Sequence, residues 1–232
     1  PSSPYRSWYD FDPKYKGGYR SWWGFETLPE VNEETPSYVE FITGVGGVID
    51  TWLRRGAAGF RLDVADELPD EFIEQIRTAV KRVGPDKFLL GEVWEDATTK
   101  FGFDKRRTYL LGKGLDSVMN YPFKNSVLDF VKGKPAQQAA NEILSICEHY
   151  PAPAINTALN FLSTHDTERA LTVIADEPAN GRGREWQSGR SVTGEAYEEG
   201  MLRLRMAYAI IYTLPGVPCL YYGDEIGMQG YR

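Results

Sequence analysis

The sequence predicts an α/β fold built on a parallel sheet. From residue 36 onward, stretches with helical periodicity alternate with short apolar runs, which is the pattern of parallel strands joined by crossover helices. Five such strand–helix units can be counted, and three of the apolar runs lead into an acidic residue. Because parallel strands of a barrel place their carboxyl ends at one face, we expect these acids to gather there.

Residues 1–35 precede this pattern and are expected to be irregular. Nine aromatic residues fall within the first 25 positions, and they follow neither a helical nor a strand period. Glycine and proline interrupt the segment throughout. We therefore divide the chain into an aromatic-rich loop region at 1–35 and an α/β part at 36–232. The aromatic rings suit either core packing or stacking on sugar rings, and the sequence leaves both open.

The α/β part is expected to contain its elements in a regular order. Apolar residues at helical spacing predict helices at 36–55, 69–83, 104–111, 125–131, 135–149 and 196–213. Short apolar runs with polar ends predict strands at 58–65, 87–94, 117–123, 157–164 and 217–222. The glycine-rich stretch at 181–194 has no periodicity, so we expect a mobile loop there, or alternatively a lid that contacts substrate.

The strand at 58–65 carries a charged pair. In GFRLDVADE, at residues 59–67, the two-residue period of a strand places Arg61 and Asp63 on one face and apolar side chains on the other. Charges on an otherwise apolar strand are costly unless they are paired or functional. Asp63 is therefore a candidate nucleophile whose charged form Arg61 stabilises, and a structural salt bridge is the alternative.

The strand at 87–94 ends in the second acid, Glu92. The same alternation puts Glu92 on the face of Trp94, and a carboxyl group beside an indole has a route to the raised pKa that a general acid needs. A solvated glutamate at a strand end is the alternative.

The strand at 157–164 runs into His165 and Asp166, the third candidate. Taken alone, Asp166 is better explained as a helix N-cap before Thr167. The three acids taken together change the interpretation, because each follows a different strand, where barrel enzymes keep their active sites.

The composition favours a neutral substrate. A formal net charge of -7 argues against nucleic acid or an anionic membrane as a partner, and no apolar run approaches the ~20 residues that span a bilayer. With only His149 and His165 present, we exclude a His-rich metal site and assign no cofactor, while an oxygen-ligand calcium site stays open. Cys147 and Cys219 are expected to be free thiols. The sequence hardly constrains the cellular location of the protein, and it favours the cytoplasm slightly over secretion.

These motifs resemble those of the α-amylase family of glycoside hydrolases. GFRLDVADE is similar to the family motif that holds an arginine and the nucleophile, GEVW to the acid/base motif, and FLSTHD to the motif with the third aspartate. The resemblance implies that Asp63 is the nucleophile, Glu92 the general acid/base and Asp166 the stabiliser of the transition state. It also implies that Arg61 and His165 orient the substrate.

Within the family, three further segments resemble neopullulanases, cyclomaltodextrinases and maltogenic amylases. These are LPEVN at 28–32, MNYPF at 119–123 and GVPCLYYGDEIGM at 216–228. Asp66 and Glu67 stand where ordinary α-amylases carry Lys-His, which also favours this group. LPEVN departs from the usual MPKLN, and this leaves the bond preference open. The resemblance adds Trp94, Glu67, Asn120 and Tyr121 as substrate-binding residues.

The resemblance implies a partial (β/α)8 barrel, running from about the third helix to the eighth strand, with residues 1–35 as the end of an excursion domain. The family's first motif, with an Asp and a His after the third strand, has no counterpart here, so we expect the chain to lack the first three strands and to have little activity alone. The implied reaction is retaining hydrolysis of the α-1,4 glucosidic bonds of maltooligosaccharides, cyclodextrins, pullulan or starch, with α-1,6 bonds as an additional target. Alternatives are a non-catalytic amylase-like scaffold and a glucan-binding module, and a homo-oligomer is left open.

Overall fold

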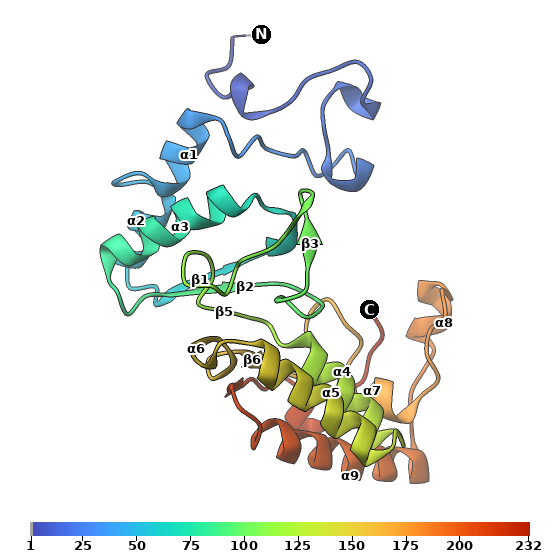
Figure 1. Cartoon of the computed structure of the whole chain (residues 1–232). Coiled ribbons are helices and arrows are strands. Elements are labelled where there is room, and N and C mark those ends of the chain that lie inside the picture. The colour runs from blue at the N-terminus through green and yellow to red at the C-terminus, as the bar shows by residue number, and fades with distance from the viewer. Residues whose placement is uncertain (1) are drawn as a thin grey trace.

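Five short parallel strands form the centre of the computed structural model, which describes residues 2–232 (Figure 1). β1, β2 and β5 pair in that order in one sheet, and β6 pairs with β7 in another. A parallel bridge between Met119 and Leu159 joins the two sheets, so the five strands follow one another in chain order. The strands are β1 (Gly59–Leu62), β2 (Phe88–Gly91), β5 (Ser117–Val118), β6 (Leu159–Asn160) and β7 (Val217–Pro218). The expected parallel α/β arrangement is confirmed, and within residues 2–232 these strands do not close into a barrel.

Helices follow the strands as expected, with changed boundaries in several places. They are α1 (Pro36–Thr43), α2 (Val48–Arg54), α3 (Asp70–Val83), α4 (Tyr121–Val131), α5 (Ala136–His149), α6 (Ala152–Ile155), α7 (Ala170–Ala175), α8 (Arg184–Ser188) and α9 (Gly194–Ile211). The loop expected after residue 164 contains α7 and α8, which the sequence pattern did not reveal.

The helix expected at 36–55 is two helices, because glycines break it. Gly44 ends α1 by donating its N–H to the carbonyl of Glu40, and Gly46 has a φ of +79°. A Cβ on Gly44 would lie 2.4 Å from the carbonyl oxygen of Glu40. Only glycine fits this close turn, so the chain changes direction before α2.

The helix expected at 104–111 is wrong. A hairpin of β3 (Phe101–Gly102) and β4 (Lys105–Arg106) stands there, followed by turns. Its next residue, Arg107, is buried and donates to Asp70 and to the carbonyl oxygens of Asp66 and Leu68. These hydrogen bonds hold the segment against the loop after β1. Such tertiary contacts outweigh the local helical periodicity of the sequence.

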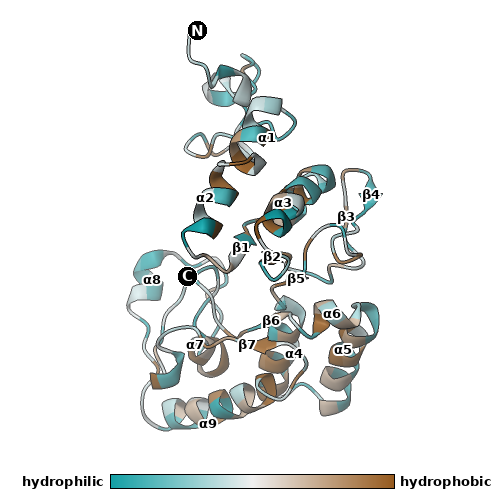
Figure 2. Cartoon of the chain, turned by 90° about the vertical axis from the view of Figure 1, so that its left-hand side faces the viewer, coloured by the Kyte–Doolittle hydropathy of each residue, from teal (hydrophilic) through white to brown (hydrophobic). Residues whose placement is uncertain are grey.

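The core lies in two main clusters of buried hydrophobic residues. One packs α2, α3 and α5 around β2 and includes Ile73, Leu89 and Phe123. The other packs α4, α7 and α9 together through residues such as Leu128, Leu171 and Leu204. Figure 2 shows hydrophobic residues on these last three helices where they meet.

The N-terminal segment is irregular, as expected, and lies at one end of the molecule (Figure 1). It contains three short 3-10 helices at 6–8, 16–18 and 22–24, and isolated bridges pair Tyr9 with Val31 and Ser21 with Pro29. Its contacts with the rest of the chain include the indole of Trp8, which donates to Ser37 on α1. Among the residues described, no helix combines the length and apolar character needed to cross a membrane.

Candidate active site

Two of the three candidate acids lie side by side at the ends of neighbouring strands. Leu62 pairs with Gly91 across β1 and β2, so Asp63 and Glu92 are the next residues along the two strands. The backbone keeps them together beyond the strands, because the N–H of Glu92 donates to the carbonyl of Leu62 and Ala65 donates to the carbonyl of Glu92. The parallel pairing therefore brings the two acids to one edge, as the sequence indicated.

Arg61 links these two carboxylates. Its Nη1 donates to Oδ1 of Asp63, and its Nη2 lies 2.9 Å from Oε1 of Glu92. Asp63 lies one residue beyond the end of β1, and the Arg61 side chain reaches it from within the strand. The Asp63 side chain is 74% exposed, whereas the Glu92 side chain is 4% exposed. One guanidinium thus positions an accessible carboxylate next to a buried one.

Glu92 is surrounded by hydrogen-bond donors. Its Oε2 accepts from the backbone N–H of Val64 at 3.0 Å. Its Oε1 accepts from the indole N–H of Trp94 and the hydroxyl of Tyr121, both at 3.2 Å. The predicted contact between Glu92 and an indole is therefore present. The tyrosine hydroxyl can also accept a hydrogen bond, whereas the backbone and indole N–H groups can only donate. Among these three partners, Tyr121 is therefore the one that can accept from the carboxyl group of Glu92 when that group carries a proton.

A set of stacked aromatic rings supports this carboxylate. The rings of Trp94 and Tyr121 stack with centroids 4.4 Å apart and planes at 13°, and Phe161 meets Tyr121 edge-on at 4.8 Å. Tyr121 is 1% exposed, and burial together with the nearby charge of Glu92 raises the pKa of its hydroxyl far above the ordinary value. Trp94 remains half-exposed beside the site. The aromatic group can therefore both fix Glu92 and offer one ring edge or face to a ligand.

Asp166 approaches the same region from β6. Its Oδ2 lies 3.1 Å from Nε2 of His165, and its Oδ1 lies 3.6 Å from Arg232. The N–H of Asp166 donates to Oγ1 of Thr164, which fixes the turn after the strand. The charge of Asp166 contributes to the raised pKa of Tyr121, so Tyr121 lies within electrostatic reach of both Asp166 and Glu92.

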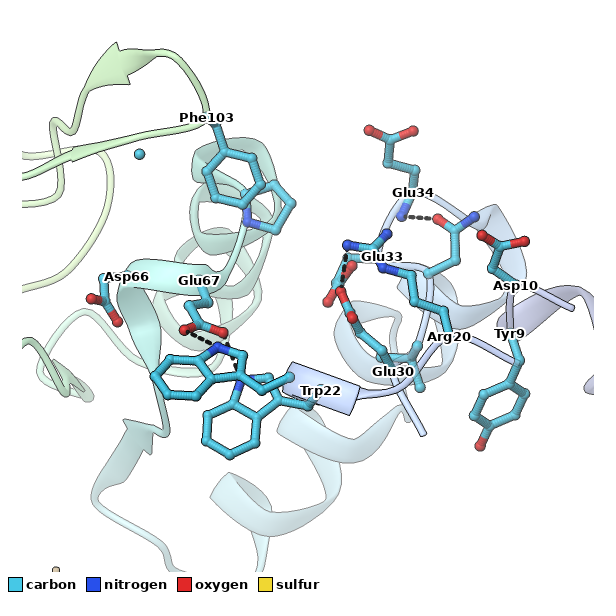
Figure 3. A pocket seen from close by; sticks show the side chains of 15 residues that line it. Tyr9, Asp10, Arg20, Trp22, Glu30, Glu33, Glu34, Asp66, Glu67 and Phe103 are labelled. Carbon is cyan, nitrogen blue, oxygen red and sulfur yellow. Dashed lines mark hydrogen bonds and ion pairs between the residues drawn. The ribbon is translucent and has the colours of Figure 1, made fainter. Parts of the chain in front are cut away.

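The remaining sequence-predicted residues lie around these three acids. Asn120 is fully buried, accepts from the N–H of Phe123 at the start of α4 and donates to Asn160 at 3.0 Å. Glu67 accepts from the indoles of Trp22 at 2.6 Å and Trp23 at 3.0 Å (Figure 3). Asn120 is thus placed to hold the scaffold, and Glu67 lies at the junction with the N-terminal segment.

Val64 is a site residue that the sequence did not reveal. It follows Asp63 with φ +44° and ψ +47°, a left-handed conformation that is unfavourable for a β-branched side chain. This turn directs its N–H to Glu92 and ends β1 just before Asp63. Backbone outliers of this kind gather at functional sites. A valine inside an apparent strand pattern carries no sign of such a role.

No group of three or more His, Cys, Asp or Glu side chains within residues 2–232 is arranged to hold a metal ion. Cys147 and Cys219 are free thiols whose pKa values are raised by burial. The functional groups described at the site are its carboxylates, the Arg61 guanidinium and its aromatic rings.

A family model described as the catalytic domain of α-amylase matches residues 6–232. The chain belongs to the α-amylase family. An amylopullulanase of Thermoanaerobacter thermohydrosulfuricus is 34% identical to this chain over an alignment 253 positions long, gaps included, which covers 98% of this chain and 16% of the relative. A cyclomaltodextrinase of a Bacillus species is 33% identical, with 89% of this chain and 31% of the relative covered. The resemblance found in the sequence is confirmed.

Solved structures agree with the sequence relatives of this α-amylase-family chain. A cyclic α-maltosyl-(1→6)-maltose hydrolase of Arthrobacter globiformis, in complex with that sugar, superposes with a TM-score of 0.79 at 27% identity and covers 100% of this chain. The match takes in 46% of that structure. This chain therefore spans less than half the length of that solved structure and about a sixth to a third of the two curated relatives.

Proposed function

We propose that the protein is a retaining glycoside hydrolase that cleaves α-1,4 glucosidic bonds, and α-1,6 bonds as well, in maltooligosaccharides, cyclodextrins, pullulan or starch. The observation that carries the proposal is the Arg61 guanidinium, which contacts Asp63 and lies 2.9 Å from Glu92. The names of the relatives, which include an amylopullulanase and a cyclomaltodextrinase, support an α-glucan as substrate.

Asp63 acts as the nucleophile. It is the exposed carboxylate of the pair, and its contact with the Arg61 guanidinium orients it for attack on the anomeric carbon. Retaining enzymes need their two carboxyl groups about 5–5.5 Å apart, because no water has to fit between nucleophile and sugar. A single guanidinium that reaches both Asp63 and Glu92 supports such a short separation.

Glu92 acts as general acid and then as general base. It protonates the leaving oxygen while Asp63 forms the glycosyl-enzyme bond, and it next takes a proton from the water that breaks that bond. Tyr121 can exchange its donor and acceptor roles at Oε1 of Glu92 between the two steps. Asp166 stabilises the oxocarbenium-like transition state, and His165 orients the sugar beside it. Transfer to a sugar acceptor in place of water is the expected side reaction.

We also propose that the five strands belong to a (β/α)8 barrel, from about its third helix to its eighth strand, and that residues 1–35 end an excursion domain. A TM-score of 0.79 to a longer α-amylase-like hydrolase supports this assignment. The rival function, a non-catalytic scaffold or glucan-binding module, is disfavoured because all three acids and Arg61 are present.

Glu92→Gln in the full-length protein tests the function directly. Gln keeps the shape but has no proton to give, so glycosylation by a natural glucan should slow by about 10²–10⁴-fold. An α-glucosyl fluoride needs no acid, so Asp63 should still be glycosylated. The intermediate should then accumulate, because Gln cannot deprotonate water, and intact-mass spectrometry should show one added glucosyl unit on the peptide 59–67.

Added azide is the control for the same variant. It needs no base, so it should attack the β-linked intermediate on Asp63, restore turnover and give a glucosyl azide of α configuration. Label on Asp166 in place of Asp63 would reverse the assignment of the nucleophile. Full activity of Glu92→Gln on starch would contradict the function proposed for Glu92.

A further inference from the structure

A cavity of about 670 Å³ lies between the N-terminal segment and the loops that follow β1 and β2. Its walls come from residues 9–34, from the loop at 66–69 and from the β3–β4 hairpin. None of Arg61, Asp63, Glu92 and Asp166 lines it. Its volume is within the range of small-ligand sites, about 300–1,000 Å³. The cavity is therefore separate from the three acids and Arg61, and its own walls determine which ligand fits it.

One wall of the cavity is aromatic. Trp22 and Trp23 stack at 5.0 Å with planes at 20°, and Phe103 comes from the hairpin (Figure 3). Trp23 is 74% exposed and Phe103 is 54% exposed. Glu67 accepts both indole N–H groups and so fixes the tryptophan pair against the loop after β1. Large apolar rings are thus held open to solvent at a fixed position.

The facing wall is rich in carboxylates. Figure 3 shows Asp10, Glu30 and Glu34 across the cavity from Phe103 and Glu67. Among its cationic groups, Arg20 pairs with Glu30 at 2.7 Å. Burial raises the pKa of Glu33, another residue of this wall. The wall therefore offers many hydrogen-bond acceptors and an excess of negative charge.

The aromatic wall is built at a conformational cost. Phe103 and Asp104 form a two-residue hairpin turn with φ values of +53° and +58°. Turns with two such residues strongly favour Asn-Gly or Asp-Gly, so a phenylalanine at the first position is unfavourable. Trp23 also has a positive φ of +50°. Two exposed aromatic residues at strained positions on the same cavity indicate a use for their rings.

These walls exclude several ligand classes. Negative charge opposes a phosphate or another anion, and carboxylates oppose a purely apolar ligand. Within the part of the chain that the structure describes, no cluster of acids is arranged for a single metal ion. A pyranose ring has an apolar face for an aromatic wall and a rim of hydroxyl donors for a carboxylate wall.

We propose that this cavity is an accessory glucan site that holds glucosyl units of a chain or branch extending from the catalytic centre. Phe103 and Trp23 supply the stacking surface, and the carboxylates of the facing wall accept sugar hydroxyls. Glu67 lies only four residues after Asp63, so an extended substrate can reach both places. The inference rests on the proposed function and adds to it a preference for long substrates.

Phe103→Asn and Trp23→Asn in the full-length protein test the site. Asn is favoured at positive φ, so both variants should fold, and the thermal midpoint of Phe103→Asn should stay equal or rise. The value of kcat/KM for maltoheptaose should fall by about 5- to 20-fold in each variant, while that for maltotriose changes by less than about twofold. Phe101→Ala is the matched control, because Phe101 is exposed on the same hairpin outside the cavity.

Equal losses on both substrates, or no loss on maltoheptaose, would overturn the inference while leaving the proposed function intact. Titration of the Glu92→Gln protein with maltoheptaose, followed by calorimetry, should show weaker binding once Phe103→Asn is added. Spermidine can be tested as a competitor of maltoheptaose. If it binds and competes only in proteins that retain Phe103, the cavity is a site for cations, and this result would also overturn the inference. Full activity of Glu92→Gln itself would instead contradict the proposed function.

Discussion

At the scale of single residues, Glu92 depends on groups that its own strand does not supply. Val64, Arg61 and Tyr121 reach it from β1 and from the start of α4. The sequence predicted that Asp63 and Glu92 lie at the ends of adjacent strands. The prediction needed only the alternation of side chains along each strand and the order of the strands in the chain, and both can be read locally. It could not reveal the left-handed turn at Val64, since that conformation is imposed by the neighbouring strand and not by the valine itself.

The N–H of Val64 is expected to hold the Glu92 carboxylate in position through its hydrogen bond to Oε2. Replacing Val64 by α-hydroxyisovaleric acid keeps the side chain but removes the N–H that stabilises the carboxylate of Glu92. The carboxyl group should then be held less firmly beside Asp63. The value of kcat/KM for a maltooligosaccharide should fall by up to about tenfold, which corresponds to about 1.4 kcal/mol.

Val64→Gly is the matched control for that ester, because glycine adopts the left-handed conformation freely and keeps the N–H. Its kcat/KM should match that of the unmodified protein. An unchanged kcat/KM of the ester would show that the Val64 N–H has no influence on Glu92.

At the scale of elements, the sequence predicted the parallel strands and most helices but not where they end. The strand expected at 117–123 stops at Val118, and α4 begins at Tyr121. Asn120 causes the change by capping the helix through the N–H of Phe123. Apolar residues that suit a strand also suit a buried helix start, so periodicity alone could not separate them. The hairpin at β3–β4 was missed because the buried Arg107 decides its path.

Asn120→Ala should destabilise the junction between β5 and α4. It removes the cap of α4 and the hydrogen bond to Asn160, both in a fully buried position. We expect the free energy of unfolding to fall by about 1–3 kcal/mol, measured by urea denaturation. Asn120→Asp keeps the capping oxygen but loses the donor to Asn160, so it should separate the two contributions. Equal stability of Asn120→Ala and the unmodified protein would contradict the role of the cap.

At the scale of the whole molecule, carboxylates join elements that lie far apart in the chain. Asp116 accepts from Arg77 at 2.7 Å, from Lys81 at 2.8 Å and from the N–H of Leu89 at 2.8 Å, so it connects α3 with β2 and β5. Burial raises the pKa of Asp116, but the hydrogen bonds from Lys81, Arg77 and Leu89 outweigh that effect, and the pKa lies below its ordinary value. The sequence could not predict this group of hydrogen bonds around Asp116, because the residues that form it come from three separate segments.

Because the pKa of Asp116 is lower in the folded protein than in the unfolded chain, its stabilisation is complete above the unfolded value of about 3.9 and is lost as the pH falls through the folded value. Asp116→Asn should therefore lower the free energy of unfolding by about 2 kcal/mol at pH 7, and the difference should shrink below about pH 4. Urea unfolding at pH 7, 5, 4 and 3 measures this convergence. Asp104→Asn, in the exposed hairpin turn, is the control and should follow the unmodified protein at each pH. A gap between Asp116→Asn and the unmodified protein that stays constant down to pH 3 would mean that Asp116 acts through its shape and not through its charge.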